Sequence, residues 1–261
     1  MLKFGLIGEK LSHSISPKIH SNIFEETSFT ADYSLYEISR ENLPDFRRFM
    51  EENNLSGINV TIPYKQEIMP YLDEISSVAK QIGAVNTVVR KDGNLIGHNT
   101  DYYGFGAMLK FHEIAFRGKT VVVLGNGGAA KAVCAYLSNN GACQVYVASR
   151  KQSNDESIIT YEQISALDDY LLVNTTPVGM YPNVNNSPVD EDLVAKSSGV
   201  VDLIYNPQTT RLMELAKKEE KPCCNGMFML IAQAVKAQEI WRSASFFDGL
   251  TQKIYETQNR G

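Results

Sequence analysis

The chain has 261 residues, a formal net charge of −5 and a hydrophobic fraction of 43%. The length allows one large domain or two ordinary ones, and the apolar fraction is ample for a packed core. No basic stripe and no apolar run of bilayer-spanning length stands out, which disfavours nucleic-acid binding and a membrane span.

The cysteines indicate a reducing compartment. They are Cys134, Cys143, Cys223 and Cys224, and they lack the spacing of a metal-ligand set. Cys223 and Cys224 are adjacent, which suits neither a zinc site nor an ordinary disulfide. We therefore expect a cytoplasmic protein without a metal site. The N-terminus is expected to form a first strand rather than a signal peptide.

The first half of the chain alternates strand and helix signals. Strands are expected over residues 2–7, 31–37, 57–62, 84–90 and 95–99. The last two flank Asp92-Gly93, which is a strong hairpin signal. Helices are expected between and after these strands. Ser16 is expected to cap the first, with Pro17 at its first position, and apolar spacing predicts others around residues 43–50 and from Asp101.

A lysine stands at the exit of one of these strands. The stretch G-I-N-V-T-I-P-Y-K, from Gly57 to Lys65, is rich in residues that favour a pleated strand. Pro63 cannot continue a central ladder, so it is expected to end the strand and can open a helix. Lys65 is thus expected on a rigid mount, as catalytic groups require, although an isolated lysine after a strand is usually a surface residue.

The second half has the pattern of a parallel sheet. Short apolar runs recur over residues 120–124, 144–148, 170–174 and 199–203, with helical stretches between them. Such runs are typical of strands buried on both faces in a βαβ array. The helices from about residue 226 are expected to pack back on the first domain.

A glycine-rich turn after the first of these strands predicts a dinucleotide site. The segment G-N-G-G-A-A, from Gly125 to Ala130, fits the G-x-G-x-x-A pattern between a strand and a helix. Gly125 permits the tight turn, Gly127 lets the backbone approach a pyrophosphate, and Ala130 allows close packing of helix on strand. The alternative is a tight turn without a ligand.

The end of the next strand favours NADP over NAD. An NAD site usually has an acidic residue here to hold the ribose 2′-hydroxyl, whereas this chain has Ser149, Arg150 and Lys151. Cations suit a 2′-phosphate, because a guanidinium matches phosphate geometry. The alternative is two solvated cations in a loop.

Polar groups that could share a cleft with Lys65 come from several segments. They are Ser14, Ser16, Thr61, Asn86, Asn99, Asp101 and Gln233. Asn86 interrupts the apolar run A-V-N-T-V-V, where an unpaired amide would be costly, so it must have partners. Asp101 and Ser16 also have structural interpretations, as a carboxylate in the first turn of a helix and as a helix cap.

Eight segments together resemble the motif series of the shikimate dehydrogenase family, in its order and spacing over nearly the whole chain. They are S-H-S-I-S-P from Ser12, G-I-N-V-T-I-P-Y-K from Gly57, G-A-V-N-T from Gly83, H-N-T-D-Y-Y-G from His98, G-N-G-G-A-A from Gly125, N-T-T-P-V-G-M from Asn174, D-L-I-Y-N-P from Asp202 and G-M-F-M-L-I-A-Q-A from Gly226. The sequence departs from the family at S-R-K-Q-S-N-D-E, where N-R-T and a further basic residue are usual.

The resemblance implies an α/β fold of two domains with a deep cleft between them. Residues 1–100 with 226–261 would form the substrate domain, and residues 101–225 a Rossmann-type NADP-binding domain. The implied activity is the NADPH-dependent, reversible reduction of 3-dehydroshikimate to shikimate in aromatic amino-acid biosynthesis. The implied partner is this small molecule, without nucleic acid or membrane, and the implied assembly is a monomer or homodimer.

The resemblance also implies the roles of particular residues. The catalytic pair would be Lys65 and Asp101. The substrate pocket would be lined by Ser14, Ser16, Thr61, Asn86, Tyr205 and Gln233. The cofactor would be held by Gly125, Asn126, Gly127, Gly128, Ala129, Ala130, Ser149, Arg150, Lys151, Thr175, Gly226 and Met229. Whether Lys65 donates a proton or acts mainly as an electrostatic clamp stays open.

Three rival interpretations remain. A quinate or quinate/shikimate dehydrogenase is close in chemistry, and Ser16, in place of a bulkier threonine, leans away from it. A dinucleotide-sensing protein without turnover is disfavoured by the presence of both Lys65 and Asp101. A purely structural α/β module does not explain the clustered polar motifs.

Overall fold

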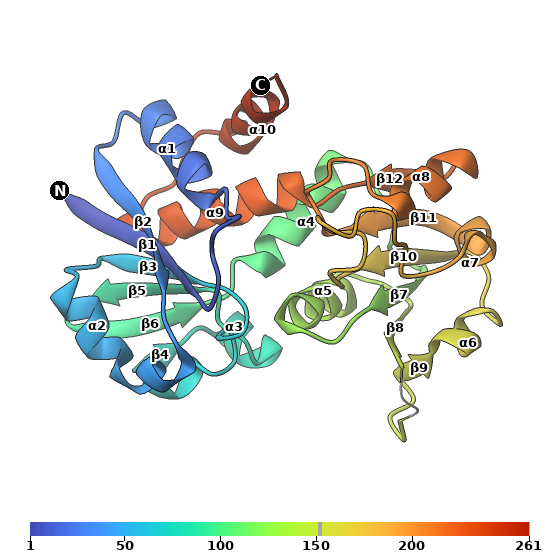
Figure 1. Cartoon of the computed structure of the whole chain (residues 1–261), viewed down its shortest axis with the longest axis horizontal. Helices are drawn as coiled ribbons and strands as arrows, with labels where there is room; N and C mark the ends of the chain where they lie inside the picture. Colours follow the sequence, from blue (N-terminus) through green and yellow to red (C-terminus); the bar gives the residue numbers. More distant parts are fainter. Residues whose placement is uncertain (151–152, 261) are drawn as a thin grey trace. The chain divides into compact units, whose positions relative to one another are not determined.

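The computed structural model describes residues 1–150 and 153–260 of the chain (Figure 1). It divides into two compact units. The first unit comprises Met1–Gly104 and Ile231–Gly261, and the second comprises Phe105–Leu230. Each unit is built around its own six-stranded sheet, which confirms the predicted α/β class.

The sheet of the first unit has the order β2-β1-β3-β5-β6-β4. Its strands are β1 Leu2–Gly8, β2 Ala31–Glu37, β3 Gly57–Val60, β4 Glu74–Ile75, β5 Thr87–Lys91 and β6 Asn94–His98. β1, β2 and β3 are parallel, whereas β5 is antiparallel to both β3 and β6. The hairpin between β5 and β6 turns at Asp92 and Gly93, which both have positive φ, as predicted.

Helices cover this sheet and contribute to its two cores. They are α1 Ser16–Glu26, α2 Phe46–Glu52, α3 Ser77–Ile82 and α10 Leu250–Arg260, with short 3₁₀ turns η1 Arg40–Asp45 and η2 Met69–Tyr71. α4 Asp101–Phe111 and α9 Met227–Arg242 each continue from one unit into the other. Ile7 and Val88 belong to one core, and Phe4 and Val89 to the other, as alternation along a strand requires.

Gly57 is required by close packing in the second of these cores. The Trp241 indole donates a hydrogen bond to the Val88 carbonyl oxygen at 2.9 Å, and its ring stacks on Phe4. A Cβ atom at position 57 would lie 2.3 Å from Trp241 Cδ1. The glycine that begins β3 therefore makes room for the tryptophan of α9.

The sheet of the second unit is entirely parallel, with the order β12-β11-β10-β7-β8-β9. Its strands are β7 Thr120–Leu124, β8 Gln144–Ser149, β9 Ile158–Thr160, β10 Tyr170–Asn174, β11 Ser197–Asp202 and β12 Cys223–Cys224. Its helices include α5 Gly128–Asn139, α6 Tyr161–Ile164, α7 Glu191–Lys196 and α8 Arg211–Lys218. Numbered within this unit, the strand order is 3-2-1-4-5-6, which is the order of a dinucleotide-binding Rossmann fold.

Two local predictions were wrong. Ser16 is the first residue of α1 rather than its cap, because Ile15 occupies the cap position. β3 ends at Val60, and Pro63 lies in a run of turns rather than at the start of a helix. Tyr64 holds these turns in place, because its ring is fully buried and its hydroxyl donates to the Ile38 carbonyl at 2.6 Å.

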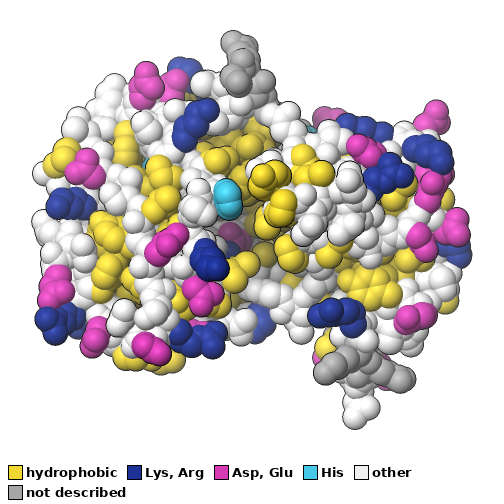
Figure 2. Space-filling view, viewed as in Figure 1, with side chains coloured by type: hydrophobic (Ala, Val, Ile, Leu, Met, Phe, Trp, Pro, Cys, Tyr) yellow, Lys and Arg dark blue, Asp and Glu magenta, His cyan; other side chains and the backbone are white. Residues whose placement is uncertain are grey.

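The surface carries charges of both signs. Figure 2 shows lysine and arginine side chains interspersed with aspartate and glutamate over the visible face. Among the described residues, no helix combines the length and apolar character needed to cross a membrane.

Candidate active site

The predicted site residues of the first unit lie together at one edge of its sheet. Ile7 of β1 lies opposite Val60 of β3, so the segments that follow these parallel strands start at the same edge. Thr87, at the start of β5, lies opposite both Asn59 and His98. The register therefore gathers residues that lie beyond β1, beyond β3, before β5 and beyond β6. They are Ser14, Ser16, Thr61, Lys65, Asn86 and Asp101.

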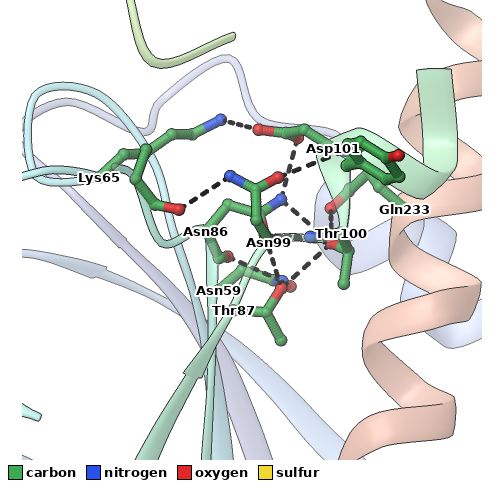
Figure 3. A network of polar contacts seen from close by, with 10 residues as sticks. Asn59, Lys65, Asn86, Thr87, Asn99, Thr100, Asp101 and Gln233 are labelled. Atoms are coloured by element: carbon green, nitrogen blue, oxygen red, sulfur yellow. Dashed lines mark hydrogen bonds and ion pairs between the residues drawn. The ribbon is translucent and has the colours of Figure 1, made fainter. Parts of the chain in front are cut away.

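Lys65 and Asp101 form an ion pair at this edge (Figure 3). Lys65 Nζ lies 2.6 Å from Asp101 Oδ2, and the two side chains are only 14% and 9% exposed. Desolvating two charges is costly, so such a pair is weak evidence for a role in stability. The pair is better explained by a functional role, in which it holds the Lys65 ammonium largely away from bulk water.

Asn86 holds the other oxygen of this carboxylate. Its Nδ2 donates to Asp101 Oδ1 at 2.9 Å and to Thr100 Oγ1 at 3.0 Å. Its Oδ1 accepts the Thr100 backbone N–H at 2.7 Å. Both oxygens of Asp101 are thus engaged, one by the lysine and one by the amide. The buried amide that the sequence singled out has the partners it needs.

Gln233 of α9 contacts Thr100, one of the residues around the ion pair. The Thr100 hydroxyl lies 3.3 Å from Gln233 Oε1, although the two residues are far apart in the sequence. Asn99 lies beside them and donates to the Ala84 carbonyl at 2.9 Å. Asn99 and Thr100, which precede α4, are therefore hydrogen-bonded to the segment before β5 and to α9.

Ser14 and Ser16 lie together in the segment after β1. The Ser14 hydroxyl donates to Ser16 Oγ at 3.1 Å, and the Ser16 backbone N–H donates to Ser14 Oγ at 3.3 Å. Both side chains are partly exposed, and the cap residue of α1, Ile15, offers no side-chain hydrogen bond to the first turn. Hydroxyls and backbone N–H groups at a helix N-terminus can bind an anion such as a carboxylate.

The glycine-rich turn of the second unit lies at the topological switch point of its sheet. β7 has β8 on one side and β10 on the other, and ligands of open α/β sheets bind beyond the carboxyl ends of such strands. Gly125 follows β7 with a φ of 102°, and a Cβ atom there would lie 2.7 Å from Thr175 Oγ1. Thr175 follows β10 and donates to the Leu124 carbonyl at 2.6 Å. The structure thus brings Gly125 and Thr175 together.

The start of α5 fits the phosphates of a dinucleotide. Gly127 precedes the helix, and no side chain caps the first turn. Apart from its chain neighbours, no atom of the described residues lies within 4 Å of where a Cβ atom of Gly127 would be, so this turn has the open space that a close-approaching ligand needs. Asn126, Gly128, Ala129 and Ala130 complete the turn, and Ala130 is buried as predicted.

The cationic segment after β8 is only partly described. Ser149 ends β8 and Arg150 is exposed just beyond it, at the same sheet edge as Gly125. Arg150 also lowers the pKa of Tyr161, against the larger rise that burial causes. Lys151, the third member of the prediction, lies outside the described residues.

A buried carboxylate fixes the loops beyond β10 and β11. Asp202 accepts hydrogen bonds from Asn174 Nδ2 at 3.0 Å, from the Ile204 backbone at 3.1 Å and from the Thr210 hydroxyl at 2.6 Å. Burial raises the pKa of Asp202, and these three donors oppose the rise. Asp202 thereby joins the segment of Thr175 to the segment of Tyr205.

Three predicted residues lie elsewhere in the second unit. Tyr205 lies in the second unit, in the segment that follows β11. Gly226 donates to the Ile204 carbonyl at 3.1 Å, and a Cβ atom there would lie 2.0 Å from the Leu203 carbonyl oxygen. Met229 is buried on α9. Gly226 is thus required for close packing of two backbone segments.

Sequence reasoning missed the polar residues beneath the ion pair. Asn59, Thr87 and Thr100 are buried and hydrogen-bonded around Asn86. For Asn59 and Thr87 the available signal was their position in apolar strands, where a polar side chain needs a partner. Which residues are the partners depends on the register of β3, β5 and β6.

Comparisons with known proteins agree over the whole chain. A family model described as the shikimate dehydrogenase substrate binding domain matches residues 6–88. A shikimate dehydrogenase (NADP(+)) of Clostridium beijerinckii is 48% identical over 259 residues, covering 97% of this chain and 96% of that protein. The crystal structure of shikimate dehydrogenase 1 from Peptoclostridium difficile aligns with a TM-score of 0.92 and 42% identity, over 99% of this chain and 98% of that one. The shikimate 5-dehydrogenase of Thermus thermophilus, in complex with NADP(H) and shikimate, aligns with a TM-score of 0.86 and 30% identity, over 98% of this chain and 99% of that one.

Proposed function

This chain belongs to the shikimate dehydrogenase family, and on that premise we propose how its residues carry out the NADP-dependent reaction. It is an oxidoreductase of the shikimate pathway that reversibly reduces 3-dehydroshikimate to shikimate. The observation that carries the residue assignment is the sheltered ion pair of Lys65 and Asp101, surrounded by hydrogen-bonding side chains.

Lys65 acts on the oxygen of the substrate ketone. When bound, NADPH supplies the hydride that reduces the ketone carbon. The Lys65 ammonium stabilises the negative charge that develops on the oxygen and donates the proton that completes the alcohol. Asp101 orients Lys65 through the 2.6 Å contact and accepts a hydrogen bond from a ring hydroxyl of the substrate. In shikimate oxidation Lys65 takes the proton back.

The remaining first-unit residues hold the substrate in place. Ser14 and Ser16 bind its carboxylate with their hydroxyls and the N-terminus of α1. Asn86, Thr61 and Gln233 take the ring hydroxyls, and Tyr205 is a further substrate-binding residue. These contacts align the reacting carbon with the hydride donor, and such alignment supplies much of an enzyme's rate enhancement.

The cofactor is held by the second unit. Gly125, Gly127 and the first turn of α5 bind the pyrophosphate, and Asn126, Gly128, Ala129, Ala130, Thr175, Gly226 and Met229 line the rest of the site. Ser149, Arg150 and Lys151 take the ribose 2′-phosphate. An arginine that follows a strand of the sheet is well placed to bind this phosphate bidentately.

Arg150→Ala is expected to weaken the preference for NADP. Losing one charge-assisted contact costs about 1.5–3 kcal/mol, so kcat/KM with NADP should fall about ten- to 150-fold while kcat/KM with NAD changes little. Steady-state kinetics with both cofactors measure this, and Arg117→Ala, which changes another exposed arginine of the same unit, is the control. An unchanged ratio of the two kcat/KM values would remove Arg150 from the site.

Shikimate is expected to be oxidised in preference to quinate. The two substrates differ by a ring hydroxyl, and the small Ser16 side chain favours shikimate. Initial rates of NADP reduction with each substrate, at matched concentrations, give the two kcat/KM values. Equal values would identify a dual-specificity enzyme, and no turnover of either would favour a binding protein that only senses the dinucleotide.

We place the enzyme in the cytoplasm as a monomer or homodimer. The support for the compartment is the set of four unpaired cysteines among the described residues. Sedimentation of the purified chain measures the oligomeric state.

A further inference from the structure

A line of buried hydrogen bonds runs beneath the catalytic pair. It starts at Tyr33 of β2, whose hydroxyl donates to Asn59 Oδ1 at 2.9 Å. Asn59 Nδ2 donates to Thr87 Oγ1 at 3.1 Å, and Thr87 Oγ1 donates to Asn86 Oδ1 at 3.0 Å. Asn86 Nδ2 then donates to Asp101 Oδ1 at 2.9 Å. Figure 3 shows Asn59, Thr87 and Asn86 below the ion pair.

Backbone groups fix the direction of this line as far as Thr87. The Thr100 backbone N–H can only donate, and it lies 2.7 Å from Asn86 Oδ1. The Asn86 carbonyl can only accept, and it lies 3.4 Å from Asn59 Nδ2. Both amide orientations are therefore determined, and Thr87 must accept from Asn59. Its own proton is left for Asn86 Oδ1 or for Thr100 Oγ1, 3.1 Å away.

Thr87 is the central link and has no contact with solvent. Its side chain is fully buried, as are those of its neighbours Asn59, Asn86 and Thr100 to within a few per cent of exposure. A substrate cannot touch it, so it acts through Asn86. Successive hydrogen bonds in a medium of low dielectric constant polarise and rigidify one another. Holding the Asn86 oxygen on one side keeps its Nδ2 aimed at Asp101.

The Tyr33 end of the line is also held firmly. The His20 ring stacks on the Tyr33 ring, with centroids 3.9 Å apart and an interplanar angle of 12°. Gln238 of α9 lies 3.0 Å from His20 Nδ1. Burial lowers the pKa of His20 to about 3, so this ring is neutral at physiological pH.

We propose that Thr87 is a positioning residue, and that the hydrogen-bonded chain from Tyr33 through Asn59, Thr87 and Asn86 holds the Asp101 carboxylate in the orientation that serves Lys65. This inference rests on the proposed function, because it assigns Asp101 to the reaction. The structure requires the Thr87 hydroxyl for the role and not its methyl group.

The test separates the hydroxyl of Thr87 from its shape. Thr87→Val keeps the branched shape and loses the hydroxyl, whereas Thr87→Ser keeps the hydroxyl and loses a methyl group. We expect kcat for shikimate oxidation to fall about three- to tenfold in Thr87→Val and to be restored to near the wild-type value in Thr87→Ser. The KM for NADP should be unchanged in both, because the cofactor is held by the other unit.

Two controls exclude a merely structural effect. Thr27→Val removes another hydrogen-bonded hydroxyl of the first unit, one that donates to the Ile23 carbonyl at 2.7 Å, and should leave kcat unchanged. In an Asn86→Ala background, Thr87→Val should have no further effect on kcat, since its action passes through Asn86.

Each result decides the proposal. If kcat is as low in Thr87→Ser as in Thr87→Val, it depends on the shape of the side chain and not on its hydroxyl. This result would overturn the proposal while leaving the proposed function intact. An additive effect in the Asn86→Ala background would do the same. A wild-type enzyme that does not oxidise shikimate would overturn the proposed function, and the inference with it.

Discussion

Lys65→Ala is expected to lower kcat about 10²–10⁴-fold, because general acid–base catalysis contributes rate enhancements of this size. KM for shikimate should change far less, since Ser14, Ser16 and the other first-unit residues still hold the substrate. The ammonium is needed chiefly when charge develops on the reacting oxygen, so its loss affects the transition state more than the bound ground state. Steady-state rates of shikimate oxidation and of 3-dehydroshikimate reduction measure both constants.

The control variant changes a lysine that forms an ion pair with an aspartate outside the proposed site. Lys119 of the second unit lies 3.4 Å from Asp169 at the surface, and Lys119→Ala should leave kcat unchanged. Near-normal kcat in Lys65→Ala would contradict a catalytic role for the lysine. A rise in KM at constant kcat would reassign Lys65 to substrate binding.

Asp101→Asn is expected to have the second-largest effect. The substitution keeps the shape but removes the charge that orients Lys65, and losing a hydrogen bond to a charged partner costs about 1.5–3 kcal/mol, or roughly a ten- to 150-fold fall in kcat. It also leaves a sheltered ammonium without its counter-charge, which is strongly destabilising when the site is well buried. Kinetics and thermal unfolding of the same preparation measure the two effects.

A double variant shows whether the two residues act as a unit. When groups act together, removing the second costs little once the first is gone. The Lys65→Ala, Asp101→Asn double variant should therefore have about the same kcat as Lys65→Ala alone. If the two single effects on kcat multiply, the aspartate contributes to turnover independently of the lysine, beyond its hydrogen bond to the bound substrate.

The sheet of the second unit could be predicted well from the sequence. β7, β8, β10 and β11 are apolar runs bounded by turns, and each was expected close to its observed range. β4 and β12 have only two residues each, too few to show a periodic pattern, and their existence depends on pairing with β6 and β11. Local propensity could not reveal them.

The first unit shows where local rules give way to packing. Ser16-Pro17 has the form of a helix cap followed by a first-turn proline, yet the helix starts one residue earlier and Ser16 hydrogen-bonds to Ser14 instead. Pro63 ends the strand region but does not open a helix, because Tyr64 anchors a series of turns in the core. Lys65 is rigidly mounted for a different reason from the one the sequence indicated.

The candidate site was predictable in its members but not in its connections. Lys65, Asn86 and Asp101 stand in motifs, and the cost of burying an amide already required partners for Asn86. The roles of Thr87 and Asn59 follow only from the register that places them opposite each other in β5 and β3. A one-residue slip of either strand would turn its side chain to the other face of the sheet and separate the two residues.

The most direct test of the account is the consumption of NADPH with 3-dehydroshikimate by the wild-type enzyme and by Lys65→Ala, together with the binding of shikimate to both. We expect rapid turnover by the wild type, and in Lys65→Ala turnover at least about a hundredfold slower with shikimate binding weakened far less. A Lys65→Ala enzyme that consumes NADPH at the wild-type rate would contradict the central claim that this lysine acts on the reacting oxygen.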